Sequence, residues 1–207
     1  MTARCRRCGD TIAVMSTKLV VAVTVIALAS VAPAAADAET ARAAGGLEPL
    51  VSAISLRLST ADQVASAKWG TGKPIDDPDR EGQVYRAALS AARDEQLDPA
   101  RVEQIFRTQI DANKAVQRGL FLFWQTVPPA APVQRPDLAA VRPLLDSLNV
   151  EIVSQIGEQR VTLAAADCVP ALASAAVRAA TAQRLDGLHS VALVHAVSAL
   201  CGPVSAR

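Results

Sequence analysis

The chain has few aromatic residues and few of the alternating apolar and polar runs from which β-strands are made. Only three Phe, two Trp and one Tyr occur in 207 residues. Strands favour β-branched and aromatic residues in a period of two, so this scarcity excludes a protein built mainly from a sheet. Apolar residues recur instead at spacings of three and four. We therefore predict an all-α fold, a single-domain helical bundle of about six helices.

A net charge of either sign is also lacking. Lys and Arg number 21 and Asp and Glu number 20, which gives a formal net charge of +1. Proteins that bind nucleic acid or anionic membranes carry a strong basic field, so neither partner is expected. The sequence also has no metal-ligand triad, no phosphate-binding glycine loop and no signature of an activated nucleophile. We expect neither a metal nor a cofactor.

One long apolar run stands near the N-terminus. Residues 19–32 are apolar or small apart from one Thr and one Ser, with Lys18 before them and small residues in 34–38 after them. The run is too short to span a bilayer comfortably and ends in a cleavable pattern, which is typical of a signal peptide. We predict that residues 1–38 are removed on export, leaving residues 39–207 in the periplasm or outside the cell without membrane attachment. The alternative is a retained N-terminal anchor.

The first 14 residues lie ahead of this pattern. Met15 is the better start, because Lys18 then falls in a short basic region directly before the apolar run. Residues 1–14 are then an over-extended gene start. Cys5 and Cys8 have the C-x-x-C spacing of a zinc or redox half-site, but no second ligand pair lies nearby in the sequence and a metal role is not expected.

Cys168 and Cys201 are the cysteines of the predicted exported domain. In an oxidising compartment such a pair is most simply a disulfide, which would stabilise the fold by about 3–4 kcal/mol in the chain-entropy model. A catalytic cysteine is the alternative, since His189 and His195 lie in the same part of the chain. No nucleophile signature surrounds either cysteine, so the disulfide is the preferred interpretation.

Helix start signals divide the domain into six segments. Asp77-Pro78 and Asp98-Pro99 each place an N-cap residue before a proline at the first helical position. Four prolines in residues 127–136 indicate an extended connection, a crossover within one domain because the apolar stripes on both sides need partners. The predicted helices are about 47–69, 78–96, 99–124 and 137–159, which together span about 47–159, and two disulfide-tied helices, about 168–185 and 188–200, within 168–201.

Cations and amides interrupt the apolar stripes of three of these helices. Burying such groups costs several kcal/mol unless they are paired, so the stripes indicate a bundle built around a small anionic ligand. The stripes are Leu50, Ile54, Arg57, Ala61, Val64 and Lys68 in the first helix; Val102, Phe106, Gln109, Asn113, Gln117, Leu120 and Trp124 in the third; and Leu138, Val141, Leu145, Leu148, Ile152 and Ile156, with Arg142 beside them, in the fourth.

These polar positions fall at helical spacings. Arg57 and Lys68 are separated by about three turns and roughly 16 Å along one face. Asn113 and Gln117 lie one turn apart. A further cluster occupies the first turn of the second helix: Asp77, Arg80 and Glu81. Together these residues offer cations for carboxylates, amide donors for an oxyanion and carboxylates for a hydroxyl.

Taken in order, the polar residues and their neighbours resemble the exported, all-helical chorismate mutases of bacteria. No single element is specific, whereas the ordered set with its spacings is, and it covers nearly all of residues 39–207. The resemblance rests on these residues and segments: Arg57, Lys68-Trp69, 74–81, 109–117, 137–149 with Asp146-Ser147-Leu148-Asn149, and Cys168 and Cys201 of the secreted subclass.

The resemblance implies an intramolecular Claisen rearrangement of chorismate to prephenate, with no cofactor and no covalent intermediate. This chemistry requires a flexible substrate to be held in a compact conformer and negative charge on the breaking ether oxygen to be stabilised. By resemblance, Lys68 and Gln117 donate to the ether oxygen. Arg57 and Arg142 hold the two carboxylates, with Lys68 also able to reach one.

The other substrate contacts implied by the resemblance surround the ring hydroxyl and the neighbouring carboxylate. The site is expected within a single chain, and the resemblance also implies a homodimer. Arg142 precedes Pro143, which disfavours helical geometry at the preceding residue, so we expect this helix to be kinked or to begin late. The remaining contacts are Asp77, Arg80, Glu81 and Asn113.

Each of these residues also has a purely structural interpretation. Long basic side chains often cover apolar surface, buried amides can be satisfied within a core, and first-turn carboxylates complement the helix dipole. Their joint occurrence in the right order favours the site. The rival function is a non-catalytic secreted helical binding protein derived from a mutase.

Overall fold

The structure is a computed structural model that describes residues 46–204. The expected signal peptide, the start at Met15 and the pair Cys5 and Cys8 lie outside the described residues. Within them the chain forms helices and no strand, which confirms the all-α prediction. The helices are α2 (Glu48–Lys68), α3 (Pro78–Asp94), α4 (Pro99–Thr126), α5 (Leu138–Glu158), α6 (Arg160–Ala164), α7 (Cys168–Ala182) and α8 (Gly187–Val197), with a 3₁₀ turn over Pro128–Ala130.

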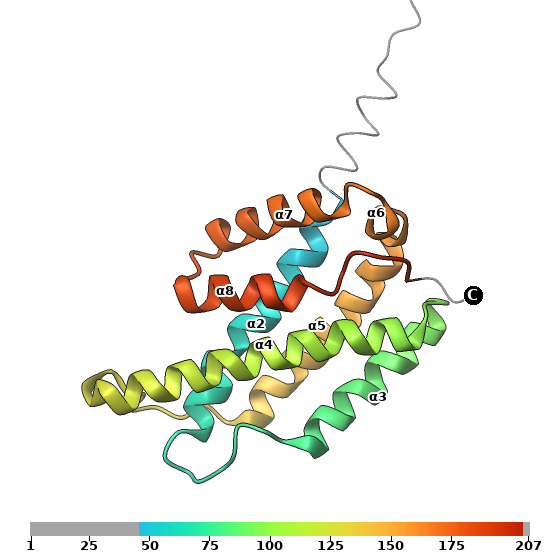
Figure 1. The fold of residues 1–207 in the computed structure, drawn as a ribbon. Helices are drawn as coiled ribbons and strands as arrows, with labels where there is room; N and C mark the ends of the chain where they lie inside the picture. Colours follow the sequence, from blue (N-terminus) through green and yellow to red (C-terminus); the bar gives the residue numbers. More distant parts are fainter. Residues whose placement is uncertain (1–45, 205–207) are drawn as a thin grey trace, which may run out of the picture. The chain divides into compact units, whose positions relative to one another are not determined.

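Helix α2 lies at the centre of the bundle. It packs against α4, α5, α7 and α8, while α3 packs against α4 and α5 (Figure 1). The long α4 also contacts α8, so the C-terminal helices cover α2 and α4 together. Leu50, Ile54 and Phe106 are fully buried where α2 and α4 meet the rest of the core. Helices α2 to α5 thereby form one side of the bundle, and α7 and α8 brace its other side.

Aspartate side chains cap four of the helices. The side chain of Asp77 accepts a hydrogen bond from the Arg80 amide at the start of α3. Asp98 does the same for α4, and Asp137 for α5. Asp186 caps α8. Each such cap contributes about 1 kcal/mol, and the two Asp-Pro starts that the sequence predicted are confirmed.

The structure differs in detail from what was expected of α5 and of the connection before it. Helix α5 was expected to be kinked or to begin late, and it does not begin late, because Asp137 caps it and Pro143 lies inside it. Proline there removes one amide donor, which leaves the carbonyl of Ala139 without its usual partner, but the helix continues on both sides. The short α6 was not predicted, because five residues are too few to show a helical period. The connection 127–136 is not extended throughout, since it contains the 3₁₀ turn.

The disulfide between Cys168 and Cys201 is present, with 5.8 Å between the two Cα atoms. It joins the first residue of α7 to the segment that follows α8. The alternative of a catalytic cysteine is thereby excluded, because neither sulfur is a free thiol. Closing a loop of this length restricts the unfolded chain and stabilises the fold.

His189 ties the C-terminal helix α8 to α2. Its Nε2 lies 2.9 Å from Asp62 and its Nδ1 lies 2.8 Å from Asp186, while the residue is only 6% exposed. The hydrogen bond with Asp62 and the one with Asp186 raise the pKa of His189 from 6.5 to about 9, against the lowering effect of burial. The imidazolium therefore bridges two helices at neutral pH.

This bridge predicts a loss of stability at alkaline pH. The pKa is raised in the folded state, so the ion pairs contribute fully below pH 6.5 and their contribution disappears as pH rises to about 9. Because both aspartates are exposed and screened, we expect the free energy of unfolding to fall by about 2 kcal/mol over this range. Denaturant unfolding should show this fall in the native protein and much less of it in His189→Gln. The exposed His195 provides the matched control, and an identical pH dependence for His189→Gln, His195→Gln and the native protein would contradict this role.

Candidate active site

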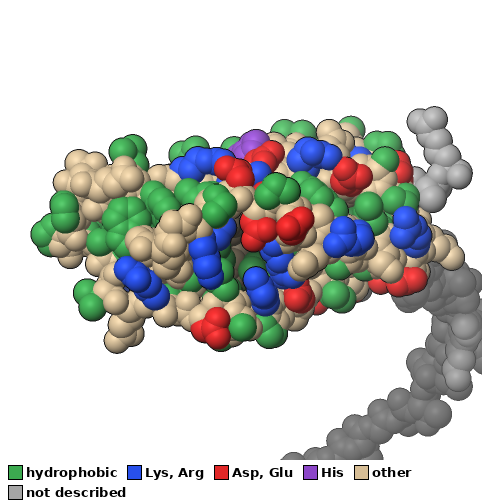
Figure 2. Space-filling model, turned by 90° about the horizontal axis from the view of Figure 1, so that it is seen from below, with side chains coloured by type: hydrophobic (Ala, Val, Ile, Leu, Met, Phe, Trp, Pro, Cys, Tyr) green, Lys and Arg blue, Asp and Glu red, His purple; other side chains and the backbone are tan. Residues whose placement is uncertain are grey.

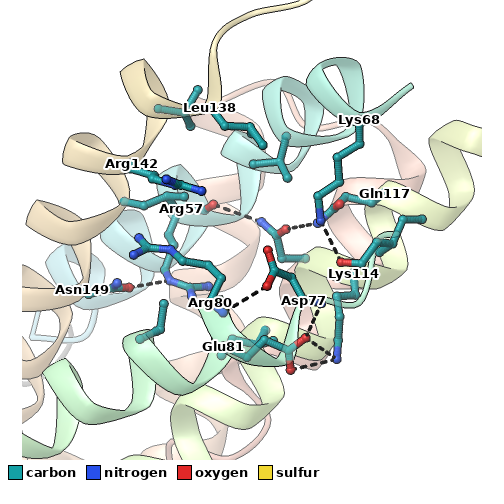
Figure 3. A pocket seen from close by; sticks show the side chains of 17 residues that line it. Arg57, Lys68, Asp77, Arg80, Glu81, Lys114, Gln117, Leu138, Arg142 and Asn149 are labelled. Atoms are coloured by element: carbon teal, nitrogen blue, oxygen red, sulfur yellow. Dashed lines mark hydrogen bonds and ion pairs between the residues drawn. The ribbon is translucent and has the colours of Figure 1, made fainter. Parts of the chain in front are cut away.

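A cavity of about 110 Å³ lies between α2, α3, α4 and α5. Space of this size exceeds the ~10–15 Å³ that a single water requires, so a small organic molecule can enter. Its walls are apolar on α5 and on parts of α2 and α4, where Val64, Ile110 and Leu145 face it. The structure brings together around this one cavity all eight predicted site residues: Arg57, Lys68, Asp77, Arg80, Glu81, Asn113, Gln117 and Arg142 (Figure 3).

Arg57 extends into the cavity from the middle of α2. It is 5% exposed, and its Nε donates to Oδ1 of Asn149 on α5 at 2.7 Å. Its guanidinium carbon lies 5.8 Å from the centre of the Phe106 ring. Burial lowers the pKa of Arg57 to about 10, because little water is left to solvate the charge. An anion in the cavity would supply the missing solvation.

Lys68 occupies the last turn of the same helix. It is 7% exposed, and its ammonium donates to the carbonyl of Ile75 at 2.8 Å. Burial lowers the pKa of Lys68, and the nearby carboxylates of Asp77, Asp76 and Glu81 act against that change. An ammonium has three donors, so two remain for a ligand.

Gln117 and Asn113 form the amide pair of α4. Gln117 is 3% exposed, and its Nε2 donates to Oδ1 of Asn113 at 2.8 Å. The side-chain amide of Gln117 carries two N–H groups, so one is free to donate into the cavity. Its Oε1 is buried and has no hydrogen-bond partner among the described residues. A buried polar atom left without a partner is costly in a core, which favours a ligand-facing role for this side chain.

The three residues at the start of α3 are tied down by their neighbours. Asp77 caps the helix, and Nη2 of Arg80 donates to Asp146 on α5 at 2.6 Å. Glu81 is paired with Lys114 on α4, whose Nζ lies 3.2 Å from its Oε2. The charges of Arg80 and Glu81 at the cavity are therefore partly neutralised by these ion pairs.

Arg142, on α5, is a further cation that lines the cavity. Its side chain reaches the cavity that it lines with Arg57 and Leu138, so Pro143 does not turn it away from the site (Figure 3). The residue is exposed, which places it at the mouth of the cavity, whereas Arg57 lies in its depth.

The cations of the cavity fall into two groups. Arg80 and Lys114 have carboxylate partners. Within residues 46–204, no carboxylate oxygen lies within 4.0 Å of the side-chain nitrogens of Arg57, Lys68 or Arg142. On the face shown in Figure 2, acidic side chains lie beside many of the basic ones and offset them, so the unpaired cations are a local feature. Three unpaired cations with a free amide donor suit a small ligand that carries two carboxylates.

Comparison with known proteins agrees with this chemistry. The family described as chorismate mutase type II matches residues 48–118. A secreted chorismate mutase of Mycolicibacterium smegmatis is 40% identical over 176 residues, which cover 85% of this chain and 97% of that protein. The chain belongs to the chorismate mutase family. A secreted chorismate mutase of Mycobacterium tuberculosis is 35% identical over 85% of this chain and 88% of its own length.

The fold shows the same relationship. The crystal structure of a chorismate mutase from Burkholderia phymatum matches with a TM-score of 0.74 and 37% identity, over 77% of this chain and 98% of that one. The match to the chorismate mutase type II family covers residues 48–118, which run from the start of α2 into α4. It carries all the predicted site residues except Arg142, which α5 adds to the cavity of this chorismate mutase family member.

Two polar residues that line the cavity were missed as members of the site. Asn149 holds Arg57, and Lys114 holds Glu81. Asn149 had a signal, since it is a polar residue between the apolar stripe positions of its helix. For Lys114 the sequence shows only the spacing to Asp111 in its own helix, with which it also pairs, because its other partners, Asp76 and Glu81, come from other elements. In the described part of the chain, no three His, Cys, Asp or Glu side chains group as a metal site would, and no helix is both long and apolar enough to cross a membrane.

Proposed function

We propose that this chain is an exported chorismate mutase that rearranges chorismate to prephenate inside the cavity of a single chain. The observation that carries the proposal is the convergence of three unpaired cations and a free amide donor on one cavity. Family membership supplies the substrate. The expected removal of residues 1–38 and the secreted relatives support export. A homodimer is expected from the resemblance.

Arg57 and Arg142 hold the two carboxylates of the substrate in this proposal. One lies deep in the cavity and the other at its mouth, so together they can fold a flexible dianion into a compact conformer. Holding the reacting atoms together removes much of the entropic part of the barrier. Asn149 fixes the direction of Arg57, since it accepts from Nε and leaves the two terminal nitrogens for the ligand.

Lys68 and Gln117 stabilise the ether oxygen as its C–O bond breaks. Each has donors left over after its contacts within the protein. Donors fixed in place before the reaction stabilise developing charge without reorganisation, which is commonly the largest contribution to catalysis. Asp77, Arg80, Glu81 and Asn113 surround the ring hydroxyl and the neighbouring carboxylate.

The proposal is tested by adding the purified protein to chorismate. Loss of chorismate absorbance with prephenate as the product, in the absence of any added metal or cofactor, is the expected result. Chorismate that binds but is not consumed would instead identify the rival function, a non-catalytic secreted binding protein. No binding and no turnover would contradict both.

Gln117 predicts how activity depends on pH. An amide donates at any pH, so turnover is expected to change little between pH 6 and 8. In Gln117→Glu the side chain donates only when it is protonated, so kcat should fall about tenfold for each pH unit above the pKa of the new carboxyl group. Rate measurements from pH 5 to 8 on both proteins test this. A native profile that falls with the slope of a titrating carboxyl, or a flat profile for the variant, would contradict the assigned role.

A further inference from the structure

The loop between α2 and α3, residues 69–77, forms one edge of the cavity. Ile75 and Asp77 line the cavity, whereas residues 70–74 are exposed. The carbonyl of Ile75 accepts the hydrogen bond from the Lys68 ammonium. The position of this loop therefore decides where Lys68 points, and Figure 3 shows Lys68 and Gln117 on the same side of the cavity.

Contacts within the loop are short-ranged and few. Thr71 bonds to the carbonyl of Lys68 at the end of α2, and the amide of Asp77 lies 3.4 Å from Glu81 at the start of α3. These bonds set the two ends of the loop. At the start of the loop, the Trp69 ring lies 5.1 Å from that of Phe121 and 5.4 Å from that of Trp124, both on α4. These contacts hold the start of the loop and leave the part next to Ile75 to other contacts.

Asp76 attaches the other end of the loop, next to Ile75, to α4. Its two carboxylate oxygens each lie 2.8 Å from Nη2 of Arg118, and its Oδ1 lies 3.3 Å from Nζ of Lys114, both on α4. The hydrogen bond from Arg118 is the largest cause of a pKa for Asp76 below the usual value. Lys114 also binds Glu81, so one ammonium links the loop, α3 and α4.

We propose that Asp76 is a positioning residue, whose ion pairs with Arg118 and Lys114 hold residues 75–77 of the loop against α4 and thereby aim the Lys68 ammonium at the reacting oxygen. Asp76 does not line the cavity itself, so it acts through Ile75 and Lys68. The inference rests on the proposed function for its effect on catalysis. Its effect on the loop is independent of that function.

The neighbouring Asp79 provides a matched control. It is exposed in the first turn of α3, and no hydrogen bond or ion pair of its side chain is found among the described residues. Asp79→Asn removes the same charge at nearly the same place as Asp76→Asn. A general electrostatic effect on a dianionic substrate would change both variants alike.

Steady-state kinetics and hydrogen exchange together test the proposal. In Asp76→Asn we expect kcat to fall about fivefold, the scale of a partly exposed ion pair, while KM changes less than twofold because Arg57 and Arg142 are untouched. Asp76→Glu should recover most of kcat. Arg118→Gln should reproduce part of the loss, and the double variant should be no slower than Asp76→Asn alone.

Amide exchange gives a readout that does not depend on turnover. Peptides covering 70–77 should exchange several-fold faster in Asp76→Asn than in the native protein or Asp79→Asn. Equal kinetics and equal exchange for the two asparagine variants would overturn the proposal, as would losses in the double variant that simply multiply. If the native protein did not consume chorismate, the proposed function would fail while the exchange result still decided the role of Asp76.

Discussion

Replacing Lys68 with alanine is expected to lower kcat by about 10²- to 10³-fold, the usual effect of losing a donor to a developing oxyanion. Lys68 has two donors free in a cavity where it is only 7% exposed. The ether oxygen gains negative charge only as its bond breaks, so the interaction strengthens on the way to the transition state. The loss should therefore appear mainly in kcat.

The control for this variant is Lys73→Ala. Lys73 lies in the exposed part of the 69–77 loop and does not line the cavity. Its removal changes the net charge equally and should alter kcat less than twofold. Lys68→Met tests whether volume alone restores the rate, which is not expected. Turnover by Lys68→Ala close to that of the native protein would remove Lys68 from the mechanism.

Arg57 is expected to show opposite effects on activity and stability. It is a buried cation with no carboxylate within 4.0 Å in the part of the chain that the structure describes, and burial has lowered its pKa to about 10. Arg57→Met removes the charge that holds a substrate carboxylate, so kcat/KM should fall at least about 100-fold. Asn149 accepts a hydrogen bond from Arg57, so the better variant combines Arg57→Met with Asn149→Leu and does not leave the Asn149 amide without its partner.

This double variant should be more stable than the native protein, by about 1–2 kcal/mol, because an apolar pair replaces a buried charge and its amide. Denaturant unfolding and steady-state kinetics on the same preparations measure the two effects. Arg86→Met, on the exposed side of α3, is the control and should change neither quantity appreciably. A strongly destabilised double variant would contradict the expected gain in stability, and a double variant with kcat/KM close to that of the native protein would contradict the role of Arg57 in holding the ligand.

Much of the fold could be predicted because its signals are local. Asp77-Pro78 and Asp98-Pro99 fixed two helix starts, and the period of apolar residues identified all the long helices. Rules that consider only neighbouring residues failed where a local preference competes with capping and burial. Pro143 would disfavour a helix, but the Asp137 cap and the burial of Val141 and Leu148 outweigh that cost.

The residues that face the ligand could be predicted from the sequence. The residues that hold them in place through ion pairs were harder to predict. Arg57 and Lys68 break an apolar stripe, which a sequence displays directly. Lys114 and Asp146 act by ion pairs that cross from one helix to another, and their partners are remote in the chain. His189 is a similar case, since its partner Asp62 lies 127 residues away. Pairings of this kind follow from packing and leave no periodic trace in the sequence.

A crystal structure of the protein with a stable dicarboxylate that imitates the compact, rearranging form of chorismate tests the central claim most directly. The account predicts one carboxylate on Arg57 and the other on Arg142, with the ether oxygen about 3 Å from both the Lys68 ammonium and the Gln117 amide. A ligand bound outside this cavity, or one whose ether oxygen faces away from Lys68 and Gln117, would contradict it.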